Sequence, residues 1–197
     1  LVGYTNSGKS TLLKALSKDA TIVSANQLFS TLDTVVRRIP YHDGGAFLLS
    51  DTVGFIRKLP PELVAAFRAT LEEVAGADLL LLVLDSSDKD PVENFDIVLD
   101  TLKSLEADDL PRIIILNKID KTGEAAQFTA MELRARGEDT VCISALTGEG
   151  FETLLETIKH KFEEDSLYRG SDAFGRDWER MLAEMSEEEA VKEFDRV

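Results

Sequence analysis

The first residues with recognisable chemistry lie at the start of the chain. Residues 3–10 read Gly-Tyr-Thr-Asn-Ser-Gly-Lys-Ser, which matches the phosphate-binding pattern G-x-x-x-x-G-K-[ST] at every fixed position. Glycines in such a loop let main-chain N–H groups converge on phosphate oxygens, and the following helix adds the positive end of its dipole. The residues expected to line the phosphates of a nucleotide are Gly3, Asn6, Ser7, Gly8 and Thr11.

Four further residues are expected to act on the phosphates and on Mg²⁺. Lys9 supplies a positive charge for the β- and γ-phosphates, and the Ser10 hydroxyl is a Mg²⁺ ligand. The sequence Asp51-Thr52-Val53-Gly54 follows a predicted strand, and the Asp51 carboxylate would hold Mg²⁺ through water. The Gly54 N–H would sense the γ-phosphate, so Lys9 and Gly54 are both assigned to catalysis.

The identity of the nucleotide base is predicted from the segment Asn117-Lys118-Ile119-Asp120, which follows a buried strand. A carboxylate at Asp120 accepts hydrogen bonds from guanine N1–H and the N2 amino group, whereas adenine offers an acceptor at N1 and no N2 amino group. A site built to pair a polar group strongly rejects an analogue that lacks it. Asn117 would brace the loops, and the Lys118 stem would cover the face of the base.

Two loop segments complete the expected site. Ser144, Ala145 and Leu146 follow the next strand, where the Ala145 N–H is placed for guanine O6. Between the first helix and the next strand, Thr31 is assigned as a catalytic Mg²⁺ ligand, because a segment ordered by the γ-phosphate and Mg²⁺ should lie there. Thr34 is the competing assignment, and a third reading is that neither threonine binds Mg²⁺.

Alternating strand and helix signals are typical of an α/β fold, and they predict the P-loop NTPase (Ras-like GTPase) arrangement. We expect a mostly parallel six-stranded sheet with helices on both faces. The first predicted strand ends at residue 2. The other five span residues 34–41, 46–50, 79–85, 112–116 and 140–143. The predicted helices span residues 9–16, 60–75, 91–105, 123–136 and 151–162. Asp43-Gly44 is a hairpin turn signal, so the second and third strands should be antiparallel.

The chain is predicted to contain a GTPase domain at residues 1–165 and an acidic helical segment at residues 166–197. Trp178, Met181, Leu182 and Met185 form one helical stripe in that segment, which indicates a small appendage or docking element. Only two residues precede the phosphate loop, although such a loop needs a full strand before it. We therefore expect the sequence to be a fragment whose first strand begins earlier.

Composition excludes several classes of protein. The 197 residues carry a net charge of −15, which argues against electrostatic binding of DNA. No apolar run approaches the roughly 20 residues needed to span a bilayer. One cysteine, Cys142, rules out an internal disulfide framework and fits a reducing cytosol. We predict a cytoplasmic protein without a membrane span.

Residues 51–60, Asp-Thr-Val-Gly-Phe-Ile-Arg-Lys-Leu-Pro, closely resemble the HflX family of translation-factor-type GTPases, as do residues 3–11 and 28–33. The resemblance covers about residues 1–162. It implies a ribosome-associated GTPase that acts on the large ribosomal subunit in splitting or rescue, with another domain before this one. Relatives commonly have proline after Asp33, where this chain has Thr34.

The resemblance also bears on the rate of hydrolysis. Ras-like enzymes orient the attacking water with a glutamine after D-x-x-G, but this chain has Phe55, as such relatives do. We expect slow unassisted turnover, on the order of 10⁻⁴ to 10⁻² per second. Arg57 could assist in cis, although a solvated arginine is the simpler interpretation. Asn6 resembles the asparagine of potassium-activated GTPases, which makes K⁺ a candidate activator.

Three alternatives remain open at this stage. A different GTPase of the ribosome-assembly or tRNA-modifying kind usually shows Asp-x-Pro-Gly where this chain has Asp51-Thr52-Val53-Gly54. A GTP-sensing binding module would hydrolyse GTP only incidentally. An ATP-using P-loop enzyme is opposed by Asp120, which should repel adenine N1.

Overall fold

Four parallel strands form the centre of the structure, a computed structural model that describes residues 1–17, 35–41, 45–51 and 74–168. The strands are β1 (Val2–Gly3), β4 (Leu80–Asp85), β5 (Arg112–Asn117) and β6 (Thr140–Cys142), and they pair in the order β1-β4-β5-β6. Each pair is parallel, with Leu82 opposite Val2 and Ile114 opposite Thr140. Parallel strands buried on both faces require near-continuous apolar sequences, which β4 and β5 have.

The other two described strands form an antiparallel hairpin, as predicted. β2 (Val35–Pro40) pairs with β3 (Ala46–Asp51), and Tyr41 N–H donates to the Gly45 carbonyl at 3.1 Å beside the turn. The turn residues 42–44 lie outside the described part. Next to β1, the Leu1 nitrogen donates to the Ser50 carbonyl of β3. The expected six strands are therefore present as a four-stranded parallel ladder and a separate pair, because β1 is short.

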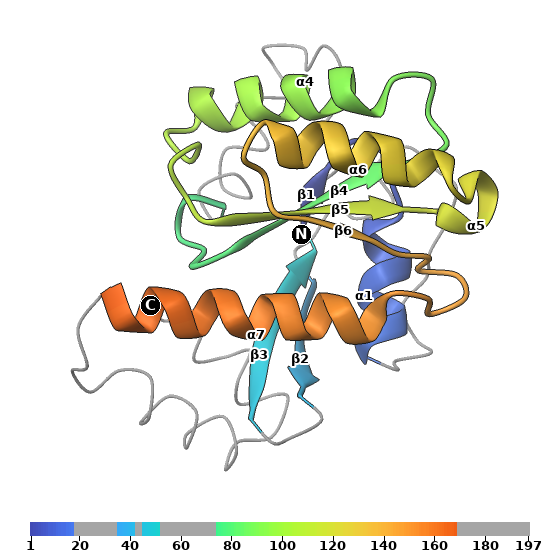
Figure 1. Cartoon of the computed structure of the whole chain (residues 1–197). Coiled ribbons are helices and arrows are strands. Elements are labelled where there is room, and N and C mark those ends of the chain that lie inside the picture. Colours follow the sequence, from blue (N-terminus) through green and yellow to red (C-terminus); the bar gives the residue numbers. More distant parts are fainter. Residues whose placement is uncertain (18–34, 42–44, 52–73, 169–197) are drawn as a thin grey trace.

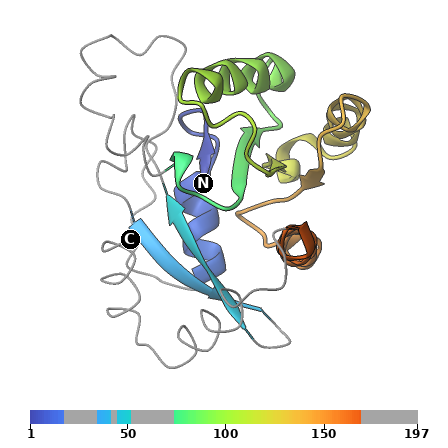
Figure 2. The same cartoon turned by 90° about the vertical axis from the view of Figure 1, so that its left-hand side faces the viewer.

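Helices cover both faces of the parallel sheet, as Figures 1 and 2 show. On one face lie α4 (Pro91–Ser104) and α6 (Ala125–Ala135); on the other lie α1 (Lys9–Ser17) and α7 (Phe151–Tyr168). A single-turn helix, α5 (Ile119–Thr122), precedes α6. The α/β architecture expected from the sequence is confirmed. None of the described helices has the length and apolar character that crossing a bilayer would need.

Helix α7 continues to Tyr168, six residues past the predicted end at residue 162 and three past the predicted domain boundary, which itself stays a prediction. The predicted helix at residues 60–75 lies outside the described residues, except for Val74 and Ala75, which are helical. The apolar stripe from Trp178 to Met185 and the rest of residues 169–197 also lie outside the described part.

The core divides into two layers because side chains alternate across a strand. Leu81 and Val83 of β4 point to the layer of α1 and α7, where Leu12 and Ile158 lie. Leu82 and Leu84 point to the opposite layer, where α4 and α6 contribute further buried side chains, including Phe95, Val98, Leu102, Ala130 and Leu133. The sheet is thus fixed from both sides, and its strand ends cannot shift independently.

Phe95 offers a direct test of the second layer. Its side chain is 2% exposed, so Phe95→Ala should lower the free energy of unfolding by about 3–5 kcal/mol. Phe128 on neighbouring α6 is 73% exposed, and Phe128→Ala should change it by less than about 0.5 kcal/mol. Denaturant unfolding followed by circular dichroism compares them; similar losses for both variants would contradict the two-layer core.

Candidate nucleotide site

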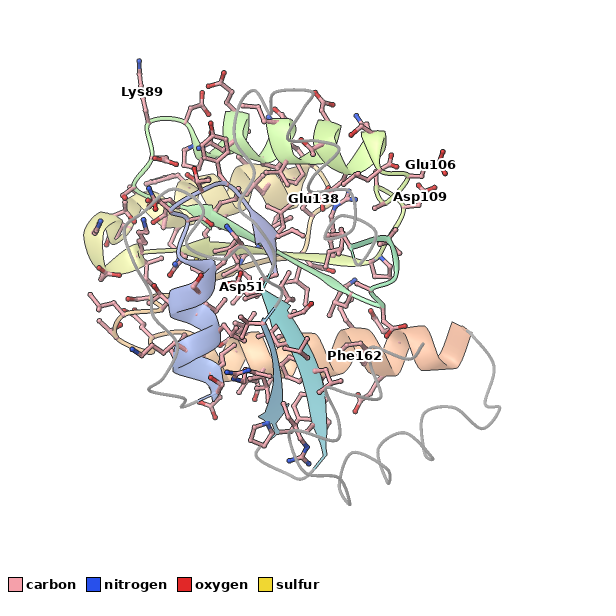
Figure 3. The ribbon with its side chains drawn as sticks, turned by 180° about the vertical axis from the view of Figure 1, so that it is seen from behind. Asp51, Lys89, Glu106, Asp109, Glu138 and Phe162 are labelled. Atoms are coloured by element: carbon pink, nitrogen blue, oxygen red, sulfur yellow. The ribbon has the colours of Figure 1, made fainter. Side chains whose placement is uncertain are left out.

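The candidate site residues gather where the parallel strands end. The phosphate loop follows β1, Asp85 ends β4, Asn117 ends β5 and Ser144 follows β6, so all four lie at the same carboxyl edge. Asp51 ends β3 close to the start of α1, and Figure 3 shows it there. The carboxyl edge of a parallel sheet is the usual place for a ligand in this class of fold.

Two glycines of the phosphate loop are required by close approaches. Gly3 has a φ of +146°, and a Cβ there would lie 2.2 Å from the Val83 carbonyl oxygen. Gly8 has a φ of +101°, and a Cβ there would lie 2.2 Å from Nδ2 of Asn117. Side chains rarely adopt such φ values and could not fit these gaps. The loop therefore packs directly on β4 and on the end of β5.

Lys9 lies inside the loop with its ammonium group held by main-chain oxygens. Nζ donates to the Gly3 carbonyl at 3.2 Å and to the Tyr4 carbonyl at 3.0 Å, and the residue is 6% exposed. Burial lowers the pKa of Lys9 to about 8, although the nearby Asp51 charge acts in the opposite direction. A buried cation bound to neutral carbonyls would gain from a phosphate, because a phosphate brings full negative charge.

A hydroxyl and a carboxylate meet beside the lysine. Ser10 Oγ donates to Asp51 Oδ2 at 2.6 Å, although 41 residues separate the two in sequence. Ser7 is 1% exposed, and its Oγ has no hydrogen-bond partner among the described residues. A buried hydroxyl without a partner is costly, and a phosphate oxygen would satisfy it. These donors fit a nucleotide phosphate, and Ser10 with Asp51 fits Mg²⁺, which prefers oxygen ligands and retains water.

Asn117 joins three segments through one side chain. Its Nδ2 donates to the Ser7 carbonyl at 2.8 Å, and its Oδ1 accepts from the Ala145 N–H at 2.9 Å. The residue is 1% exposed, so these bonds replace those that water would otherwise make. The phosphate loop, the end of β5 and the loop after β6 are consequently held at fixed distances from one another.

The predicted base-reading residues lie beyond Asn117. Ser144 Oγ donates to Oδ1 of Asp120 and accepts from the Thr147 N–H at 3.2 Å, so the orientation of the carboxylate is set. Asp120 itself is exposed, and Leu146, two residues after Ser144, is 79% exposed. The loop that orients the acidic acceptor thus also carries an uncovered apolar side chain. That pairing suits a flat heterocycle with N–H donors on its edge.

Lys118 connects the phosphate loop with a residue that the sequence analysis missed. Its Nζ donates to the Asn6 carbonyl at 2.6 Å and forms an ion pair with Asp85 Oδ2. Burial alone would raise the pKa of Asp85, but bonds from Lys118 and Ser87 and the Lys118 charge outweigh it and leave that pKa lowered. The available signal was weak: Asp85 is the single charged residue that ends the buried strand β4.

Several predicted residues cannot be placed against this geometry. Thr31, its competitor Thr34, Gly54, Phe55 and Arg57 all lie outside the described residues. Thr11 is described and lies half-buried in α1, one residue beyond Ser10. Among the described residues no three His, Cys, Asp or Glu side chains cluster closely enough to hold a metal ion. A divalent ion here would rely on a hydroxyl, a carboxylate, phosphate oxygens and water.

The chain is similar to one protein family and to individual members of known sequence. The family described as "50S ribosome-binding GTPase" matches residues 1–118. GTPase HflX of Magnetococcus marinus is 49% identical over 159 residues, which is 81% of this chain and 36% of that protein. GTPase HflX of Escherichia coli is 42% identical over 161 residues, which is 82% of this chain and 37% of that protein. The chain thus spans little more than a third of these relatives.

Solved structures resemble the fold as well. A GTP-binding protein from the hyperthermophilic archaeon Sulfolobus solfataricus, solved in complex with GDP, superposes with a TM-score of 0.67 at 31% identity. The match covers 83% of this chain and 51% of that one.

The contact between Gly8 and Asn117 can be tested by adding one methyl group. Gly8→Ala should displace the Asn117 amide and weaken GDP binding by at least about tenfold, because the amide holds both loops. Gly137→Ala is the matched control: its φ is +90°, yet nothing lies within 4 Å of the added Cβ. Both variants should lose some stability, and only Gly8→Ala should lose affinity in a fluorescent-GDP titration. Equal affinities would contradict the proposed contact.

Proposed function

Because the chain belongs to the 50S ribosome-binding GTPases, and among them to the HflX family, we propose that residues 1–165 bind GTP and hydrolyse it to GDP and phosphate. One observation carries this proposal. Asn117 links the phosphate loop to the loop after β6, so the Asp120 carboxylate lies a fixed distance from Lys9. A phosphate-binding end and a base-reading end are therefore built on one rigid strand edge.

We assign the phosphate contacts to the loop and to Lys9. The main-chain N–H groups of the loop and the Ser7 hydroxyl would bind phosphate oxygens, and the Lys9 ammonium would exchange its two carbonyl partners for the β- and γ-phosphates. Ser10 and Asp51 would hold Mg²⁺, which when bound offsets negative charge on the phosphates. A charge already placed in the fold stabilises the transition state without reorganisation.

The base contacts are assigned to the second half of the site. Asp120 would accept from guanine N1–H and the N2 amino group, and its rotation is restricted by the bond from Ser144. The Ala145 N–H would donate to O6, and the Lys118 stem and Leu146 would cover the ring. GTP would consequently be preferred over ATP by the pairing of polar groups rather than by shape.

Three assignments remain predictions from the sequence. Thr31 would complete the Mg²⁺ ligands, with Thr34 as its competitor, and the Gly54 N–H would contact the γ-phosphate. Phe55 offers no polar atom to orient water, so unassisted turnover should be slow, about 10⁻⁴ to 10⁻² per second. A partner would then supply or order the missing group, and K⁺ bound near Asn6 is a further candidate activator.

We propose the large ribosomal subunit as that partner and the cytoplasm as the location. The description of the matching family as 50S ribosome-binding GTPases supports the large subunit as partner, and the HflX relatives support the HflX branch of that family. A role in splitting or rescuing ribosomes is the finer part of the proposal. The chain carries a net charge of −15, so this contact would depend on specific surfaces rather than on overall attraction to RNA.

The role of Asp120 is tested by changing its hydrogen-bonding character. Asp120→Asn replaces an acceptor with an amide donor, so GDP affinity should fall about 100-fold or more. Xanthosine diphosphate should gain affinity, because its C2 carbonyl can accept from the new amide. Asp109→Asn is the control, since Asp109 is exposed before β5 at the opposite edge of the sheet. Unchanged base preference in Asp120→Asn would contradict the assignment.

The partner is tested by measuring turnover with and without purified large ribosomal subunits, with ATP as the parallel substrate. We expect slow hydrolysis of GTP alone, a rise of at least tenfold with subunits, and negligible turnover of ATP. Running the assay in KCl and in NaCl tests the potassium candidate, which equal rates would exclude. GTP binding without any subunit-dependent rise would count against this partner for this segment and favour a GTP-sensing module.

A further inference from the structure

We propose that Asp85, the last residue of β4, is a positioning residue that keeps bound nucleotide from dissociating, acting through Lys118. This inference rests on the proposed function, since the loops that Asp85 supports are those assigned to GTP. It adds a role to a residue that belongs to neither the phosphate loop nor the guanine-reading motif.

The Lys118 ammonium group lies between the Asn6 carbonyl of the phosphate loop, at 2.6 Å, and Oδ2 of Asp85. The side chains of Lys118 and Asp85 are only 23% and 12% exposed, so water screens the pair weakly. The ammonium group therefore joins the phosphate loop to the end of β4, and these two contacts restrict the Lys118 side chain.

The Asp85 carboxylate is itself fixed in orientation. Its second oxygen, Oδ1, accepts from the Ser87 N–H at 2.9 Å and from Ser87 Oγ at 2.6 Å. With both oxygens bound, rotation of the carboxylate would break bonds at either end. Asp85 thus provides a stationary charge for Lys118, which a freely rotating surface carboxylate would not.

The turn that carries Asp85 is anchored on two sides. Ser86 N–H donates to the Asn117 carbonyl at 2.9 Å, and Ser86 Oγ lies 2.9 Å from Oγ1 of Thr122. On the other side, Nδ2 of Asn94 donates to Asp88 at 2.9 Å, which attaches the turn to helix α4. The position of Asp85 is consequently set by the sheet and by α4.

Lys118 has a reason to need such support. Its backbone adopts φ 68° and ψ 33°, a left-handed conformation that is uncommon for residues with a side chain. Asn6, whose carbonyl it binds, also has a positive φ of 62°. Two positions in this uncommon conformation face each other, and the Asp85–Lys118 pair joins them to the sheet. Loss of the pair should let both relax and should open the nucleotide site.

The effect should appear in nucleotide release rather than in hydrolysis. The Asp85–Lys118 pair acts on the Asn6 main chain and on the Lys118 stem, whereas Lys9, Ser10 and Asp51 are the residues assigned to the reacting phosphates. Asp85→Asn keeps the shape of the side chain and removes its charge. We expect GDP to dissociate about tenfold faster from this variant, while the single-turnover rate of bound GTP stays within about twofold of the wild-type rate.

The experiment measures fluorescent-GDP dissociation for the wild-type chain, Asp85→Asn, Lys118→Met and the double variant. If Asp85 acts through Lys118, the double variant should release GDP no faster than Lys118→Met alone. Asp96→Asn is the matched control, because Asp96 forms an ion pair with Arg136 in which both side chains are about half exposed. Its dissociation rate should stay within about twofold of the wild-type rate.

A second variant covers the case in which Asp85→Asn does not fold. Ser87→Ala leaves the charge in place and removes one donor to Oδ1 at an exposed position, so release should accelerate about two- to threefold. Wild-type dissociation rates in Asp85→Asn and Ser87→Ala, or multiplied effects in the double variant, would overturn the inference alone. Failure of the wild-type chain to bind GDP would overturn the proposed function with it.

Discussion

One buried amide, that of Asn117, holds the candidate site together. It donates to the phosphate loop and accepts from the loop after β6, and the Cα of Gly8 approaches it so closely that no side chain fits between them. The amide can do this only because β5 is buried on both faces and cannot shift. The packing of two helical layers therefore determines, through one side chain, the spacing between the phosphate loop and the loop after β6.

The same rigidity allows the Lys9 ammonium group to stay buried, although burial disfavours its charged form. Lys9 is almost fully buried and bound to neutral carbonyls, and its lowered pKa reflects the cost of that burial. The Lys118 ammonium has a different solution, because Asp85 supplies an opposite charge at close range. Lys9 has no opposite charge among its hydrogen-bond partners in the described part of the chain, so a phosphate could supply one. Lys118 is already paired with Asp85 and supports the loop. Two lysines of one site are thereby assigned to binding and to positioning.

Much of the fold and site could be predicted because the signals are local. The phosphate loop, the Asn117-Lys118-Ile119-Asp120 segment and the hairpin each carry their residues within a short stretch of sequence. Asp85 could not be found this way, since its partner is 33 residues away and its own neighbours read as the end of a strand. The predicted end of α7 at residue 162 was wrong. Residues 163–168 contain no helix breaker, and the helix continues through them. Contacts between distant segments depend on packing, which local patterns do not record.

The residues at different strand ends are assigned to different parts of the nucleotide, and this bears on the rates of GTP hydrolysis and nucleotide release. On the proposed assignments, the groups at the ends of β1 and β3 would contact the reacting phosphates, whereas those at the ends of β4, β5 and β6 contact one another and would contact the base. A change at the second group should alter how long a nucleotide stays, and a change at the first should alter how fast it reacts. Residence and chemistry should therefore be adjustable separately, which suits a protein whose partner is proposed to accelerate hydrolysis while the nucleotide stays bound. Asn117 is the exception, because it belongs to both groups and should affect both rates.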